Sequence, residues 1–273
     1  MAGGFGATRD SGLLPFAEAF AAAGLDVLLF DYRTFGASTG EPRHIVDWRR
    51  HREDYASAIR FARRLRGVDP DRIVLWGSSY SGGHVIPVAA DDGRVAAVIS
   101  QVPATDGLAA LIEMARYAGP LPLLRLTALG LRDAVRGLRG QDPLRAPIVG
   151  PPGTPAALTT PDAEPGYLAV AGETFRNEFC ARAVLDAARN RPVRRAADVP
   201  CPIQFQIADR DAICPPEAAE KTAWAATGRA EVRHYPLAHF DIYLGEGRER
   251  AIADQLHFLR RHLAVREREG AAA

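Results

Sequence analysis

The sequence predicts an α/β protein with a mostly parallel β-sheet flanked by helices, and three observations support this prediction. Short apolar runs of strand length alternate with segments of helical periodicity over the first hundred residues. Such alternation places helices on both faces of a parallel sheet. It stops after residue 102 and resumes at residue 202, which indicates an insertion before the penultimate strand. The 273 residues, 47% of them hydrophobic, are enough for one large core.

The first part of the chain contains, in order, helix 11–23, strand 25–32, helix 47–66, strand 72–76, a helix directly after it, and strand 95–102. The run at 25–32 (LDVLLFDY) is nearly all apolar, as expected for a strand that is buried on both faces. Gly24 can end the helix before this run. Asp47 can cap the helix that follows it.

The rest of the chain divides into an insertion and a return to the sheet pattern. The expected elements are helices 108–117 and 121–139, a Pro- and Gly-rich stretch at 143–165, strands 202–208 and 231–235, and helix 248–263. We therefore expect a core of residues 1–104 and 199–265 and a frayed tail of residues 266–273. Residues 105–198 are expected to form a helical lid over one end of the sheet.

Composition and charge exclude several classes of function. The net charge of +1 gives no electrostatic reason to bind nucleic acid or an anionic membrane. No run of eighteen apolar residues predicts a membrane span, and the start lacks the features of a signal peptide. Three cysteines without CxxC spacing argue against a disulfide framework or a structural zinc site. We expect a cytoplasmic protein without a metal.

The strongest chemical signal is the segment 76–83 (WGSSYSGG), which lies between a predicted strand and a predicted helix. A serine on a sharp strand-to-helix turn is exposed as a nucleophile, and the residues two before and two after it must be small. Gly77 and Ser81 meet this rule around Ser79. Ser81 is the alternative nucleophile, flanked by Ser79 and Gly83. We prefer Ser79, which is closer to the strand end and has a true glycine before it; a plain Gly/Ser turn is the non-catalytic alternative.

An acidic loop and a histidine follow the last two predicted strands. Asp209 and Asp211 lie in the first loop and His239 lies in the second, which gives the chain order Ser, Asp, His. In such a triad the histidine takes the serine proton, and the carboxylate fixes the histidine tautomer. Asp211 is the preferred acid, since Asp209 can be a turn former. Asp241 can be a capping or supporting carboxylate.

Five segments make the chain resemble the α/β-hydrolase superfamily: 3–10 (GGFGATRD), 30–33 (FDYR), 35–38 (FGAS), 77–83 (GSSYSGG) and 239–243 (HFDIY). The chain is similar to dienelactone-hydrolase-like and X-Pro-dipeptidyl-peptidase-like serine hydrolases. It also resembles the polyketide transferase and thiohydrolase group. The resemblance covers nearly the whole chain and implies the α/β-hydrolase fold.

The resemblance also implies an oxyanion hole, formed by the backbone N–H groups of Tyr80 and of Phe5 in the Gly-rich loop. Family members commonly have His-Gly at the positions of Gly3 and Gly4. They also carry a few strands before this loop, and these N-terminal strands are missing here. An open sheet edge would then favour pairing with another chain, so a homodimer is expected.

Aromatic side chains of the insertion are candidates for lining an apolar substrate pocket: Tyr117, Tyr167, Phe175 and Phe179. Packing within the insertion is the alternative for each of them. Solvated surface positions are expected for Arg116, Arg125 and Arg176. Cys214 is expected to be a small buried hydrophobe rather than a reactive thiol.

The predicted function is a serine hydrolase that cleaves a small-molecule ester or thioester through an acyl-enzyme, without a cofactor. Transfer of the acyl group to an alcohol or amine is a close alternative, because it uses the same acyl-enzyme. A non-catalytic or cyclase-like binding scaffold is an alternative of another class. The presence of Ser79, Asp211 and His239 together argues against the scaffold.

Overall fold

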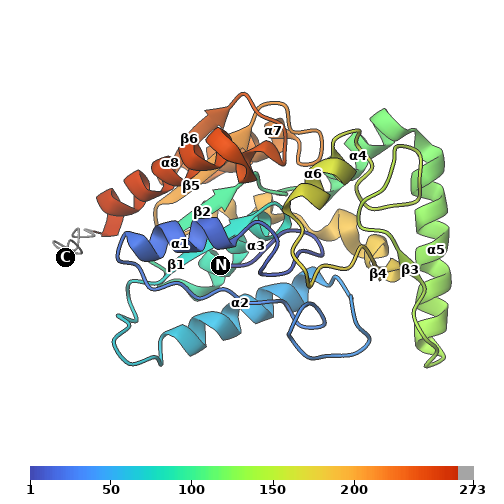
Figure 1. Cartoon of the computed structure of the whole chain (residues 1–273), viewed down its shortest axis with the longest axis horizontal. Helices are drawn as coiled ribbons and strands as arrows, with labels where there is room; N and C mark the ends of the chain where they lie inside the picture. The colour runs from blue at the N-terminus through green and yellow to red at the C-terminus, as the bar shows by residue number, and fades with distance from the viewer. Residues whose placement is uncertain (264–273) are drawn as a thin grey trace.

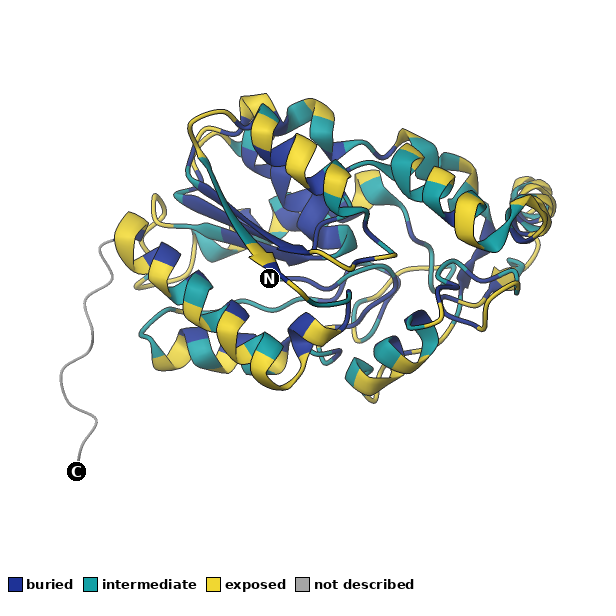
Figure 2. Ribbon diagram, turned by 90° about the horizontal axis from the view of Figure 1, so that it is seen from above, coloured by how far each residue is buried: buried dark blue, intermediate teal, exposed yellow. Residues whose placement is uncertain are grey.

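The computed structural model describes residues 1–263, and a four-stranded parallel sheet lies at its centre (Figure 1). The strand order is β1-β2-β5-β6, with bounds β1 (Val74–Ser78), β2 (Ala97–Gln101), β5 (Ile203–Ala208) and β6 (Ala230–Tyr235). Every residue of β2 and β5 is buried, because helices cover both faces of these central strands (Figure 2). The predicted parallel sheet with flanking helices is confirmed.

Helices pack on the sheet in the way the apolar periodicity predicts. The flanking helices are α1 (Leu14–Ala22), α2 (Trp48–Ala62), α3 (Tyr80–Asp92), α7 (Pro216–Ala225) and α8 (Gly245–Leu263). Helices α1 and α8 contact each other, and both reach the indole of Trp76 in β1 through Phe16 and Gln255. Helix α2 packs on α3, which contacts β1 and β2. The Asp47 side chain accepts from the N–H groups of Arg49 and Arg50, so the predicted cap of α2 is confirmed.

One predicted strand is wrong. Residues 25–32 run without assigned strand structure, although their sequence is that of a buried strand. The physical reason is the lack of a partner, since a strand is defined by its hydrogen-bonded neighbour. Among residues 1–263, only Met1 pairs with this segment as a strand would: its nitrogen donates to Leu28 O (2.7 Å), and its carbonyl accepts from Phe30 N (3.3 Å). The start of the chain is held in place, because Ala2 is fully buried and bridges Gly77.

The insertion between β2 and β5 is built mainly from helices. Its elements are α4 (Gly107–Ala118), α5 (Pro120–Leu138), β3 (Arg145–Ala146), α6 (Ala163–Val170), β4 (Phe179–Cys180), η1 (Ala181–Arg189) and η2 (Pro192–Asp198). Helices α4 and α5 lie where the sequence predicts them. The short β3–β4 ladder and the helices α6, η1 and η2 are not predicted, since they are too short or too rich in Pro and Gly for periodicity to indicate them.

A buried ion pair holds α5 against η1. Asp133 is fully buried and accepts from the guanidinium of Arg182 (2.7 Å) and from Leu144 N (2.7 Å). No helix within residues 1–263 has both the length and the apolar character that crossing a membrane requires. The tail predicted at 266–273 lies outside the described residues.

Candidate active site

Ser79 occupies the sharp turn between β1 and α3. Its backbone has φ 58° and ψ −120°, a strained conformation for a residue with a side chain. The turn brings the backbone of Ser81 so close to Gly77 that any Cβ on Gly77 would overlap it. A Cβ on Gly4 would lie 2.9 Å from Ser79 Cβ and 3.1 Å from Ser79 Oγ. A side chain is therefore excluded at Gly77 by the Ser81 backbone and crowded at Gly4 by the Ser79 side chain.

Two hydrogen bonds join three predicted residues into one chain. His239 Nε2 lies 3.1 Å from Ser79 Oγ, and His239 Nδ1 lies 2.6 Å from Asp211 Oδ2. Asp211 and His239 are buried, and both occupy loops at the carboxyl ends of β5 and β6. Since the carboxyl ends of parallel strands share one edge of the sheet, 160 residues of sequence separate side chains that touch.

The two candidate acids have different surroundings. Asp211 Oδ1 accepts from the backbone N–H groups of Ile213 (2.8 Å) and Cys214 (2.7 Å), which leaves Oδ2 for His239. Asp209 is exposed and pairs with His234 Nδ1 at 2.7 Å, away from the serine. The structure therefore brings Asp211, and not Asp209, to the histidine.

Electrostatics favour a charged imidazole in this site. Burial is the largest single influence on the pKa of His239 and lowers it, but Asp211 and Cys214 together outweigh burial and raise this pKa well above its ordinary value of 6.5. An imidazolium formed when the histidine takes a proton is therefore stabilised where it forms.

Ser81 has a different environment from Ser79. Its hydroxyl donates to Ala2 O (2.6 Å) and accepts from Ser78 N (3.0 Å), and it is fully buried. No hydrogen bond joins Ser81 to His239 within residues 1–263. The geometry therefore gives Ser81 a structural role: its hydroxyl holds the start of the chain against β1.

Two backbone N–H groups near the serine, those of Phe5 and Tyr80, have no acceptor among the described residues. In the described residues, neither Phe5 N–H nor Tyr80 N–H donates a hydrogen bond to the protein. Tyr80 is the first residue of α3, so its N–H lies at the positive end of the helix dipole. Phe5 follows Gly4, whose backbone is in contact with Ser79. The oxyanion hole of Tyr80 and Phe5 stays a prediction, and the free N–H groups are consistent with it.

A small cavity of about 30 Å³ opens beside Ser79 and His239. Its walls come from the Gly-rich loop through Phe5 and from the insertion through Tyr167 and Val170. This space holds about two water molecules, since one water needs roughly 10–15 Å³. Larger acyl groups can enter only if the wall from the insertion moves.

The predicted substrate residues are not brought together. Tyr167 lines the cavity, and its hydroxyl donates to Phe5 O at 2.9 Å. Phe175 lies behind Tyr167, with ring centroids 4.8 Å apart, and Phe179 packs edge-on against the Phe5 ring at 5.1 Å. Neither of these two lines the cavity, and Tyr117 is exposed on α4. The surface positions expected for the arginines are confirmed at Arg116, Arg125 and Arg176.

Three residues near the site were missed or undervalued by sequence reasoning. Phe240 and Tyr243 line the cavity, and the Tyr243 hydroxyl is 2.5 Å from Ser78 Oγ. The segment HFDIY signals both, since it places two aromatic residues directly after the histidine. Cys214 is buried as expected, but its thiol lies within hydrogen-bonding reach of His239 and Ser79, and burial raises its pKa.

The same loops hold the group of side chains closest to a metal-ligand arrangement. In the part of the chain that the structure describes, ligand atoms of Asp211, Cys214 and His239 lie within 4.8 Å of one another. The 2.6 Å bond between Asp211 and His239 already uses one carboxylate oxygen and one ring nitrogen. This geometry is that of a hydrogen-bonded acid and base.

Comparison with known proteins places the chain in a family. Residues 10–243 match the family model described as serine aminopeptidase, S33. The chain belongs to this family of α/β-hydrolases. The quorum-quenching protein AidA of Acinetobacter baumannii is 41% identical over 268 residues, which cover 97% of this chain and 86% of AidA. The thiohydrolase aneE of Aspergillus aculeatus is 29% identical over 285 residues, covering 97% of this chain and 85% of aneE.

Solved structures confirm the fold. The crystal structure of the α/β-hydrolase GrgF from Penicillium sp. sh18 matches with a TM-score of 0.79 at 25% identity, and the match covers 97% of this chain and 89% of GrgF. The predicted superfamily, the α/β-hydrolase fold and the kinship with thiohydrolases are therefore confirmed. The protein is an enzyme, an esterase-like serine hydrolase of the α/β-hydrolase class.

Proposed function

We propose that this enzyme cleaves an ester or thioester of a small molecule through an acyl-enzyme on Ser79. The observation that carries the proposal is the hydrogen-bonded chain from Asp211 through His239 to Ser79, with distances of 2.6 and 3.1 Å. A serine needs an adjacent base, and the base needs an orienting acid, to act as a nucleophile at neutral pH.

The reaction follows from these positions. His239 Nε2 takes the Ser79 hydroxyl proton while Oγ forms a bond to the carbonyl carbon, and the N–H groups of Phe5 and Tyr80 stabilise the oxyanion. The tetrahedral intermediate collapses, and the imidazolium gives its proton to the departing alcohol or thiol. Water, deprotonated by His239, then attacks the acyl-enzyme and releases the carboxylic acid and Ser79.

The insertion acts in this proposal as a lid. Tyr167 and Val170 of α6 form one wall of the cavity beside Ser79, so movement of α6 would set the size of the acyl group. The same movement would admit an alcohol or amine acceptor, so product analysis with and without an added acceptor separates hydrolysis from acyl transfer.

The 41% identity with AidA favours a substrate class within this chemistry, an ester or a cyclic ester of a quorum signal. Ring opening of a cyclic ester uses the same steps, with the leaving alcohol held in the same molecule. Incubation of the enzyme with such signals, followed by mass spectrometry of the products, tests this class. Intact signals under conditions where simple esters are cleaved would contradict it.

The central experiment is labelling with a fluorophosphonate, which reacts with activated serines, followed by mass mapping of the labelled peptide. We expect the label on Ser79 of the native chain and no label on Ser79→Ala. Hydrolysis of a p-nitrophenyl ester should fall by several orders of magnitude in Ser79→Ala, while circular dichroism stays unchanged. A label on Ser81, or full activity in Ser79→Ala, would contradict the proposal.

A further inference from the structure

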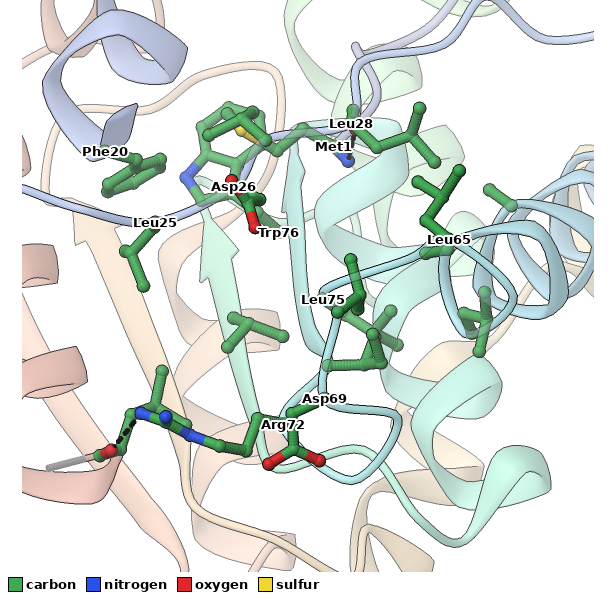
Figure 3. Close-up of a pocket in the computed structure, with 18 of the residues that line it drawn as sticks. Met1, Phe20, Leu25, Asp26, Leu28, Leu65, Asp69, Arg72, Leu75 and Trp76 are labelled. Carbon is green, nitrogen blue, oxygen red and sulfur yellow. Dashed lines mark hydrogen bonds between the residues drawn. The ribbon is translucent and has the colours of Figure 1, made fainter. Parts of the chain in front are cut away.

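Apolar side chains lie outside the packed core in two different settings. One is a cavity of about 590 Å³ between β1 and residues 24–28, where they line a concave space (Figure 3). The other is the outer side of α5, which runs along the edge of the molecule (Figure 1). No residue of α5 lines the cavity. Apolar side chains on an outer edge are removed from water only when a second surface is placed against them.

The exposed apolar residues of α5 form a regular stripe. The stripe consists of six exposed residues that follow one another in steps of three and four along the 19-residue helix: Leu121, Leu124, Ala128, Leu131, Val135 and Leu138. The five larger ones keep between 46% and 89% of their surface exposed. This is the spacing of the seam between two paired helices, and the stripe continues it along the whole of α5.

The opposite side of α5 is packed against the rest of the protein. Leu126, Gly130 and Asp133 are buried on that side. A Cβ on Gly130 would lie 2.9 Å from Ala181 O, and Asp133 binds the guanidinium of Arg182, so α5 and η1 are in close contact. Because this side holds α5 in place, the stripe faces away from the fold. Packing within one chain therefore does not account for the stripe.

The residues beside the stripe determine how a second helix can lie against it. Arg125, Arg132 and Arg139 recur every seven residues along one flank, and Thr127 and Ala134 occupy the other flank. In an antiparallel pair of α5 helices, like flanks lie side by side, so the arginines of the two copies would repel one another. In a parallel pair, the arginine flank of each helix lies beside the uncharged flank of the other. The charges therefore favour the parallel arrangement.

A lipid bilayer is a different kind of surface that covers apolar helix faces. Helices that lie on membranes have a broad apolar face, commonly with Trp or Phe as anchors. The α5 stripe takes only two positions in seven, and the helix contains no Trp, Phe or Tyr. This narrow seam fits one partner helix better than it fits a lipid surface.

We propose that α5 is the contact surface for a second copy of this chain, in a symmetric dimer whose two α5 helices pair in parallel along the stripe. A two-fold axis parallel to the helices gives this arrangement and places each residue of the stripe beside its own counterpart. The same axis puts the two folds on opposite sides of the seam, so they do not overlap. Such a dimer leaves the edges of the sheet uncovered, unlike the strand pairing expected from the sequence.

Sedimentation velocity over a range of protein concentrations tests the contact surface. We expect the native chain to be a dimer, and we expect Leu131→Asp to raise the dissociation constant of the dimer by about a hundred-fold or more, because two unpaired carboxylates would meet in the seam. Leu168→Asp on α6 is the matched control, since Leu168 is 53% exposed and Leu131 is 56% exposed, and it should remain a dimer. Circular dichroism verifies that both variants are folded.

Disulfide trapping tests the direction of the pair. All three native cysteines are buried, so Leu124→Cys and Leu138→Cys each add one exposed thiol. In the parallel pair each added thiol lies beside its own counterpart, and mild oxidation should cross-link either variant with itself. In an antiparallel pair residue 124 would lie beside residue 135, and only a mixture of Leu124→Cys and Val135→Cys chains would cross-link.

Three results would overturn the proposal. The first is a native chain that stays monomeric at every concentration, or a dimer that Leu131→Asp does not weaken. The second is cross-linking only between Leu124→Cys and Val135→Cys chains, which would show an antiparallel pair. The third is a native monomer that binds phosphatidylglycerol vesicles through Leu131, which would show that α5 covers its stripe with lipid.

Discussion

Replacing Asp211 by asparagine tests the acid–base arrangement most directly, because the structure dictates how the new amide must lie. Two backbone N–H groups, of Ile213 and Cys214, donate to Asp211 Oδ1. The amide oxygen of the substituted side chain must take this place, so its NH2 group must face His239 Nδ1. The NH2 group can only donate, so His239 Nδ1 becomes an acceptor and Nε2 carries the proton. A protonated Nε2 cannot take the proton of Ser79.

The expected loss is large. The equivalent change in a Ser-His-Asp protease costs a factor of roughly 10⁴ in kcat, which corresponds to about 5.4 kcal/mol of activation free energy at 1.36 kcal/mol per factor of ten. Steady-state hydrolysis of a p-nitrophenyl ester measures it, and thermal unfolding verifies the fold. Asp209→Asn is the matched control, since Asp209 pairs with His234 in an exposed position, and we expect less than about a five-fold effect there. Equal and mild effects of the two changes would refute the assignment of Asp211.

Three further predictions concern the same site. The kcat/KM of the native enzyme should fall as the pH is lowered through the pKa of His239, which lies above 6.5, because the protonated ring cannot act as a base. In Asp211→Asn no carboxylate offsets burial, so this fall in kcat/KM should occur at lower pH. A fall at the same pH in both proteins would contradict the prediction. Ser81→Ala should keep fluorophosphonate labelling but lower the free energy of unfolding by about 1–3 kcal/mol, because two buried hydrogen bonds are lost. Loss of labelling in a folded variant would contradict the structural role of Ser81. Phe175→Ala should let the Tyr167 ring withdraw from the cavity, so the enzyme should prefer longer acyl groups and still cleave an acetyl ester. The control Tyr117→Ala, on the exposed end of α4, should leave the preferred acyl length unchanged.

Sequence reasoning was effective where chemistry restricts the residue types. The elbow around Ser79 permits only small neighbours, and the order of Asp211 and His239 follows from the sheet, so these residues could be named from local pattern alone. The sequence favoured Asp211 over Asp209 only by its place in the loop. The structure separates the two acids, because Asp211 is buried against His239 and Asp209 is exposed beside His234. Side-chain exposure depends on contacts far along the chain, and no local pattern carries that information.

The insertion was less predictable for a related reason. Helices α4 and α5 have clear periodicity, but the role of an aromatic side chain depends on which neighbour covers it. Phe175 and Phe179 are equally apolar in sequence, yet both lie behind other rings, and Tyr167 reaches the cavity. The strand expected at 25–32 failed because strand structure requires a partner, and the partner ends at Met1.

The start of the chain supports the proposed catalytic site. Met1 pairs with residues 28–30, and Ala2 pairs with Gly77. The Ser81 hydroxyl, two residues after Ser79, donates a hydrogen bond to Ala2 O. Three residues after Ala2 comes Phe5, whose N–H is one of the two proposed oxyanion donors. Because a donor must lie within a few tenths of an ångström of its place to stabilise an oxyanion, the precision of Phe5 depends on how firmly Ala2 is held.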